Sequence, residues 1–181
     1  MIRTLSYKLI DSTNSEARRY LVSGGTESIA FVADQQSEGR GQGVNSWESS
    51  SPDGLYYSLL LQGNRYPASP SLLDETLLAK NIQNVISVIS SVKVVFKKPN
   101  DFFLDGRKIG GILIESESKP QANYSDFAII GIGLNINQAD FPTPLAETAI
   151  SLFQKTGKSF DKYAFVGLLN TYLEGMFPLQ G

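Results

Sequence analysis

Hydrophobic and polar residues alternate along this chain with two different periods. Runs rich in β-branched and aromatic residues are typical of strands, and they occupy residues 29–35, 55–62, 92–96 and 127–135. Apolar residues three or four positions apart predict helices, over about 14–21, 72–90 and 160–176. A further strand is expected at the N-terminus, ending where Asp11 leads into the first helix. The pattern predicts an α+β fold in which a mixed β-sheet is flanked by helices.

The clearest turn signal is Asp105-Gly106, which separates an apolar run at 102–104 from another at 107–115. Because Asp-Gly supplies the positive φ angles of a type I′ turn, it predicts a β-hairpin. Residues 63–71 contain two prolines and are interpreted as a connection within the domain. With 181 residues, of which 41% are hydrophobic, the chain is expected to form a single domain over 1–181.

Composition narrows the chemistry that this chain can perform. It contains no cysteine and no histidine, which excludes thiol nucleophiles, imidazole bases, Ser-His-Asp triads and the usual zinc sites. Any catalysis must use lysine, arginine, carboxylates and the backbone. A formal net charge of −2 offers no basic surface, so no nucleic-acid partner is expected. No apolar run reaches the length of a membrane span and no signal sequence is evident, so we expect a cytoplasmic protein without membrane contact.

A glycine-dense segment at 35–47 is the strongest candidate for a binding site. Glycine lets the backbone approach a ligand closely and present its N–H groups to an anion, and Arg40 adds a cation. Lys97, on a segment expected to be a strand, supplies a second cation. Together they predict a site for a carboxylate or phosphate. The alternatives are a surface turn for the loop and a solvated basic sheet edge for Lys97 and Lys98.

Residues 11–14, Asp-Ser-Thr-Asn, open the first predicted helix. Thr13 and Glu16 have the spacing of a capping box, which would account for the motif without any ligand. The alternative is that these hydroxyls and amides face a small polar ligand beside the N–H groups of the helix N-terminus.

Trp47 is the single tryptophan, and two readings of it stay open. It either caps the core or covers a planar ring such as adenine. Gly131 and Gly133 lie inside an apolar strand, where the lack of a side chain lets a ligand or another backbone come close.

Five motifs occur here in an order that resembles the biotin protein ligases. They are Asp-Ser-Thr-Asn, Gln-x-x-Gly-Arg-Gly-x-x-x-x-x-Trp, Lys-x-Pro-Asn-Asp, Lys-x-x-Gly-Ile-Leu-x-Glu and Gly-x-Gly-x-Asn. The resemblance extends from about residue 3 to residue 177. It implies the biotin/lipoate ligase catalytic fold, a mixed sheet shared with class II aminoacyl-tRNA synthetases. It also implies a two-step reaction. Biotin and MgATP form biotinyl-5′-adenylate with loss of pyrophosphate, and a lysine of a biotin carboxyl carrier protein domain then attacks the activated carbonyl.

The resemblance further implies which residues bind each substrate. The biotin set is Ser12, Thr13, Asn14, Gln36, Gly39, Arg40, Gly41, Gln42, Lys97, Gly110 and Gly111. The ATP and adenylate set is Arg40, Trp47, Lys97, Asn100, Lys108, Gly131, Gly133 and Asn135. Lys97 and Arg40 are the implied catalytic residues, acting electrostatically and not as nucleophiles. Mg²⁺ is expected to be held mainly by nucleotide phosphates, so no protein ligand is named for it.

The chain also departs from the family pattern. Gln42-Gly43-Val44 stand where two further arginines are common, and Lys98 stands where a tryptophan often separates the lysine from the proline. We expect no winged-helix domain before the catalytic domain and therefore no operator binding. The SH3-like domain that follows the catalytic domain in most relatives is not in this sequence, which is either naturally short or a fragment. A homodimer is compatible with the resemblance. The competing readings are a lipoate or octanoate ligase or transferase of the same fold, and a non-catalytic biotin or adenylate binder.

Overall fold

A computed structural model of the chain describes residues 1–67, 75–116 and 124–177. Its centre is a seven-stranded sheet with the strand order β1-β2-β3-β7-β6-β5-β4. The strands are β1 (Arg3–Ile10), β2 (Ile29–Gln36), β3 (Gly54–Pro67), β4 (Val95–Lys97), β5 (Asp101–Leu104), β6 (Arg107–Glu115) and β7 (Tyr124–Asn135). The pair β1 and β2 is parallel and every other neighbouring pair is antiparallel. The predicted mixed sheet is confirmed.

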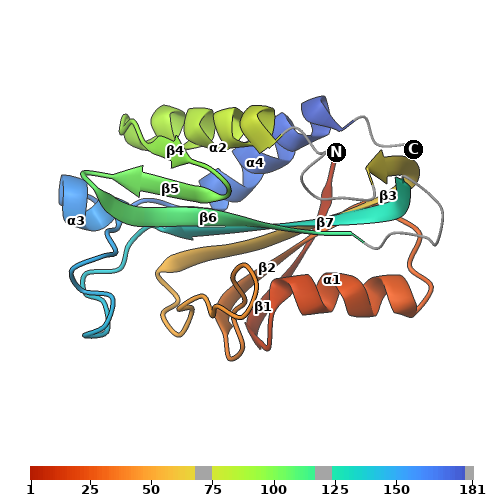
Figure 1. Cartoon of the computed structure of the whole chain (residues 1–181), viewed down its shortest axis with the longest axis horizontal. Coiled ribbons are helices and arrows are strands. Elements are labelled where there is room, and N and C mark those ends of the chain that lie inside the picture. Colours follow the sequence, from red (N-terminus) through yellow and green to blue (C-terminus); the bar gives the residue numbers. More distant parts are fainter. Residues whose placement is uncertain (68–74, 117–123, 178–181) are drawn as a thin grey trace.

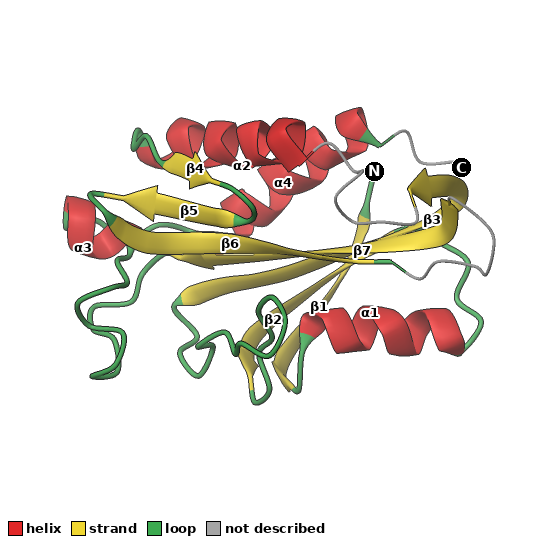
Figure 2. Ribbon diagram, in the orientation of Figure 1, coloured by secondary structure: helices red, strands yellow, loops and turns green. Residues whose placement is uncertain are grey.

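Helices cover the two faces of this sheet unequally. The long helices α2 (Glu75–Ser90) and α4 (Lys162–Met176) lie on one face, and α1 (Thr13–Val22) lies on the other (Figure 1). The short helix α3 (Leu152–Thr156) follows the connection after β7. Loops occupy much of the α1 face, and the loop between β2 and β3 lies near the start of α1 (Figure 2). No helix in the described part of the chain is long and apolar enough to cross a bilayer.

Two separate core clusters follow from the alternation of side chains along the strands. Leu59 and Leu61 face the larger cluster, which is shared with α2 and α4. Leu60 faces the smaller cluster, which packs under α1 and contains Ala17 and Phe31. The smaller cluster leaves part of the α1 face free of packed apolar side chains. The candidate site lies in this part.

The hairpin prediction is confirmed in detail. Asp105 and Gly106 have φ angles of 50° and 79°, and they join β5 to β6. The predicted helices and most predicted strands are found within a few residues of their expected ends. Residues 72–74 of the second predicted helix lie outside the described residues.

Two predictions of local structure were wrong. The strand expected at 92–96 begins only at Val95, because Val92 and Val94 pack into the larger core cluster and the Gln83 side chain binds the Val94 carbonyl. The connection expected at 63–71 belongs to β3 as far as Pro67, with a register shift against β7 between Gln62 and Tyr66. Its last residues, 68–71, lie outside the described residues.

Helix α3 was not predicted from the sequence, because its five residues are too few to show a period. Its sequence signal was a capping box, in which the Ser151 hydroxyl accepts the Gln154 N–H and the Gln154 side chain accepts the Ser151 N–H. Gly157 ends the helix with φ 69°.

Candidate functional site

A cavity of about 480 Å³ opens on the α1 face of the sheet. Its wall is formed by the start of α1, the loop after β2, and β6 and β7 where they lack large side chains. Thirteen of the residues predicted to bind ligands line it: Ser12, Thr13, Asn14, Gln36, Arg40, Gly41, Gln42, Trp47, Asn100, Lys108, Gly111, Gly131 and Gly133. They come from segments far apart in the sequence. The structure therefore brings the predicted motifs together around one space.

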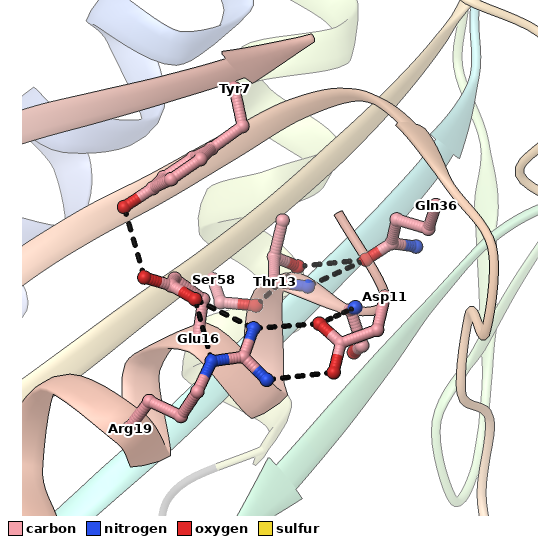
Figure 3. Close-up of polar contacts among 8 residues, drawn as sticks. Tyr7, Asp11, Thr13, Glu16, Arg19, Gln36 and Ser58 are labelled. Carbon is pink, nitrogen blue, oxygen red and sulfur yellow. Dashed lines mark hydrogen bonds and ion pairs between the residues drawn. The ribbon is translucent and has the colours of Figure 1, made fainter. Parts of the chain in front are cut away.

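The floor of the cavity is a network of buried polar groups. Gln36 Oε1 accepts hydrogen bonds from the Thr13 N–H at 2.8 Å and from the Thr13 hydroxyl at 3.1 Å (Figure 3). The Ser58 hydroxyl lies 2.7 Å from Thr13 Oγ1 and 2.5 Å from Asn14 Oδ1. On the far side of Gln36, its Nε2 donates to the Ser49 hydroxyl. Each group thus restrains the orientation of its neighbour.

The capping box predicted for Thr13 and Glu16 was wrong. The N-cap is Ser12, whose side chain makes no capping bond, and Thr13 is the first residue of α1. Gln36 satisfies the Thr13 N–H from the neighbouring strand, so no local cap is required. Glu16 instead receives hydrogen bonds from Tyr7 and Arg19 (Figure 3).

Arg19 of α1 connects this helix to the end of β1 through ion pairs. Its guanidinium binds both carboxylate oxygens of Asp11 at 2.7 Å and also binds Glu16 (Figure 3). The hydrogen bonds from Arg19 lower the pKa of Asp11 to about 2, although partial burial of the carboxylate opposes this shift. The Asp11 carboxylate also accepts the Ser12 N–H, so this ion pair supports the segment that carries the cavity floor.

We expect this pair to shape the stability of the protein in acid. A carboxylate with a depressed pKa stabilises the fold above its unfolded pKa, here 3.8, and this contribution is lost as the pH falls towards 2. Asp11→Asn should therefore lower the free energy of unfolding at pH 6, and the difference from wild type should shrink between pH 4 and pH 2. Urea unfolding across this range measures it. A difference that stays constant with pH would contradict the assignment.

Trp47 lies against the sheet at the cavity wall and belongs to neither core cluster. A Cβ at Gly133 would lie 2.6 Å from the indole Cε2, and one at Gly111 would lie 3.6 Å from Cζ3. The two glycines therefore make room for the indole ring. Lys108 Nζ lies 5.3 Å from the centre of this ring, and the buried indole Nε1 has no hydrogen-bond partner among the described residues.

Both cations of the cavity wall are paired with carboxylates of the sheet. Arg40 Nη2 lies 2.7 Å from Glu115 Oε2, and Lys108 Nζ lies 2.7 Å from Asp101 Oδ1. All four side chains are partly exposed, so an arriving anion can reach the cations from the cavity. The arrangement can bind a ligand with a polar ring at the floor and anionic groups near the loop.

Lys97 is not at the cavity wall. Its Nζ lies 4.2 Å from the centre of the Phe103 ring, and its side chain is exposed on the edge strand β4. Lys97 pairs directly with Asp101, which lines the cavity, so both side chains start from the same face of the sheet. Lys98 lies beyond the end of the strand, so the prediction that the two lysines alternate within one strand was wrong.

Three other predicted residues have structural contacts instead of a place on the wall. Gly39 is closely packed at the base of the loop, where a Cβ would lie 2.2 Å from the Ser49 hydroxyl. Gly110 faces the larger core cluster, because a Cβ there would lie 2.5 Å from Leu134 Cδ2. The amide of Asn135 donates to the Ile150 carbonyl at 3.2 Å. Each supports the site without lining it.

The sequence analysis did not single out Ser58, Asp101 or Glu115 as site residues. Ser58 carried a signal, because it is a small polar residue inside an apolar and aromatic run, and the structure buries it fully. Glu115 was part of a quoted motif, but its contacts come from residues 75 and 101 positions away in the sequence. Such contacts depend on the fold.

Comparisons with known families, sequences and structures indicate the same family. Residues 7–135 match the family described as "Biotin/lipoate A/B protein ligase family". The "Bifunctional ligase/repressor BirA" of Bacillus spizizenii is 33% identical over 156 residues, which are 85% of this chain and 47% of that protein. The "Biotin--[acetyl-CoA-carboxylase] ligase" of Paracoccus denitrificans is 29% identical, over 88% of this chain and 66% of that protein. The chain spans about half the length of the BirA relative.

Among solved structures, the fold is similar to "Biotin protein ligase from Aquifex aeolicus in complex with biotin and ATP". The TM-score is 0.80 and the sequence identity is 29%. The match covers 97% of this chain and 71% of that one.

Proposed function

Because the chain belongs to the biotin/lipoate A/B protein ligase family, we propose that it is the catalytic unit of a biotin protein ligase. In this proposal the domain joins biotin to ATP and then transfers the biotinyl group to a lysine of a biotin carboxyl carrier protein domain. The observation that carries the proposal is the cavity itself. It combines a buried polar floor with a glycine-rich loop and two cations.

The floor is suited to the ureido ring of biotin. A ureido group has two N–H donors and one carbonyl acceptor, and Ser12, Thr13, Asn14 and Gln36 offer hydroxyl and amide groups to match them. Ser12, Thr13 and Asn14 are each no more than 4% exposed. A ligand with an apolar end would cover this polar floor without forming hydrogen bonds to its remaining donors and acceptors, which is unfavourable. This favours biotin over lipoate or octanoate.

The other end of the cavity is suited to the adenylate. Trp47, whose indole ring packs against the glycines of β6 and β7, offers flat apolar surface to a purine, and Arg40 and Lys108 lie near enough to attract phosphate. The volume of about 480 Å³ lies within the usual range for small-molecule sites, about 300–1,000 Å³.

The two steps place different demands on these residues. First, a biotin carboxylate oxygen attacks the α-phosphorus of ATP, and the bond to pyrophosphate breaks. The cations offset the repulsion between the two anions and the charge of the transition state. Then the uncharged lysine amine attacks the biotinyl carbonyl, the carbonyl–oxygen bond to AMP breaks, and the amine loses a proton.

Mg²⁺ supplies further charge neutralisation when it is bound with the nucleotide. The described residues contain no group of three or more acidic side chains that could hold a metal ion by themselves. Asp101 places one carboxylate at the cavity wall. That donor set fits an ion held mainly by phosphates and water.

Exchange of labelled pyrophosphate into ATP tests the proposal directly. We expect exchange with biotin and none with octanoate or lipoate. Exchange with a fatty acid alone would assign the protein to lipoylation, and biotin binding without exchange would make it a binder. Because Trp47 is the only tryptophan and lies at the cavity wall, its fluorescence should change on binding and report occupancy independently of turnover.

A further inference from the structure

We propose that Glu115 is a positioning residue that joins the two halves of the ligand site through one carboxylate oxygen. The inference rests on the proposed function in one respect, because it takes Asn14 as part of the biotin floor and Arg40 as part of the phosphate loop. Glu115 itself does not line the main cavity. It acts on the ligand through these two side chains.

The geometry of the contact is specific. Glu115 Oε2 accepts a hydrogen bond from Arg40 Nη2 at 2.7 Å and another from Asn14 Nδ2 at 2.7 Å. Glu115 is the last residue of β6 and pairs with Ile129 of β7, so its carboxylate is held by the sheet. One atom on a rigid strand thereby fixes the first turn of α1 and the glycine-rich loop together.

Glu115 determines which way the Asn14 amide points. A carboxylate can only accept hydrogen bonds, so the amide nitrogen of Asn14 must face it. The Asn14 oxygen then faces the Ser58 hydroxyl at 2.5 Å. With the orientation fixed at both ends, Asn14 presents the same donor and acceptor to every ligand. A neutral amide at position 115 could instead accept or donate, and would permit the flipped orientation.

Glu115 also restrains the Arg40 side chain but uses only part of its hydrogen-bonding capacity. The loop around Arg40 is held by backbone hydrogen bonds from Gly41 to Asn45 and from Trp47 to Gly39. The Arg40 side chain is 40% exposed and uses one of its nitrogens, Nη2, for the bond to Glu115. A guanidinium has five N–H donors, so the others are left for an anion. This favours a supporting role for Glu115 over competition with the ligand.

The first test needs no ligand. We expect trypsin to cleave after Arg40 more slowly while this side chain is bound to Glu115, because the protease must take the arginine into its own pocket. Hydrogen bonds to a charged group are stronger than those between neutral groups, so Glu115→Gln should accelerate this cleavage about tenfold. Cleavage after the exposed Lys158 serves as the internal reference. Glu38→Gln removes an equal charge from the loop and should change the rate of cleavage after Arg40 by less than twofold. Glu115→Asp retains the carboxylate, so cleavage after Arg40 should be slower in this variant than in Glu115→Gln. An unchanged rate in Glu115→Gln would overturn the proposal.

The second test measures biotin affinity by Trp47 fluorescence. Glu115→Gln should weaken binding about tenfold in the wild-type background, and by less than twofold once Asn14→Ala and Arg40→Ala are both present. Tighter binding, or the same loss in both backgrounds, would overturn the positioning role. If wild type binds no biotin, the proposed function fails. The trypsin experiment still decides whether Glu115 holds Arg40.

Discussion

Lys97→Ala is expected to lower biotin-dependent pyrophosphate exchange by about 100-fold to 1,000-fold, the usual effect of removing one group that stabilises a developing charge. Lys97 stands directly opposite Asp101 on the edge of the sheet, and residues paired in this way have Cβ atoms about 5 Å apart. Its Nζ can therefore leave Phe103 and reach the cavity by rotation of the side chain alone. Single-turnover formation of the adenylate would measure the loss.

The same substitution should leave the stability of the fold nearly unchanged. The Lys97 side chain is exposed and lies over one aromatic ring, a contact worth about 0.5–1 kcal/mol at exposed sites. Lys98→Ala is the matched control, because it removes an equal charge one residue away and should retain exchange. If Lys97→Ala retains normal exchange, Arg40 and Lys108 are the working cations and Lys97 has no part in the mechanism.

Gly131→Ala is expected to weaken biotin binding by about 10-fold to 100-fold, because it leaves polar groups of the floor unpaired. A Cβ at Gly131 would lie 2.4 Å from Asn14 Oδ1. Asn14 is 3% exposed and bonded at both ends, to Ser58 and to Glu115, so it can yield only by breaking one of these bonds. Isothermal titration with biotin would measure the change in affinity.

Crowding at this position should also lower the free energy of unfolding, by about 1–3 kcal/mol. Gly167→Ala is the matched control, because the same glycine-to-alanine change should there raise the free energy of unfolding. Gly167 lies within α4 with no atom near its missing side chain, so alanine there should stabilise the fold by about 0.5–1 kcal/mol. Biotin affinity equal to wild type in Gly131→Ala would show that the orientation of Asn14 is unimportant for binding.

Local sequence signals predicted the features that depend on neighbouring residues. Asp105-Gly106 determined the hairpin because the required backbone angles are properties of those two residues. The glycine-rich loop and the start of α1 were placed in one site by the resemblance to the biotin protein ligases, since neither local pattern indicates the other. Val92 showed the limit of this approach. Its strand-like pattern was correct for burial, but Val92 lies outside β4 and is buried in the core cluster that the sheet shares with α2 and α4.

Contacts between distant segments could not be predicted in the same way. No local pattern indicates that Gly111 and Gly133 leave room for the ring of Trp47, since this requires the register of β6 against β7. The pairing of Arg40 with Glu115 likewise depends on where the loop lies over the sheet. The position of Lys97 outside the cavity wall follows from the rotamer of a flexible side chain, which the sequence does not determine.

The unequal faces of the sheet have a consequence for protein engineering. Along β7, Ile130 and Ile132 enter the larger core cluster, whereas Gly131 and Gly133 between them face the cavity. A library of substitutions confined to cavity-facing positions would therefore leave the main source of hydrophobic stabilisation untouched. Selection for acceptance of synthetic biotin analogues could then proceed on one face of the sheet while thermal tolerance is improved on the other, with the two sets of substitutions combined afterwards.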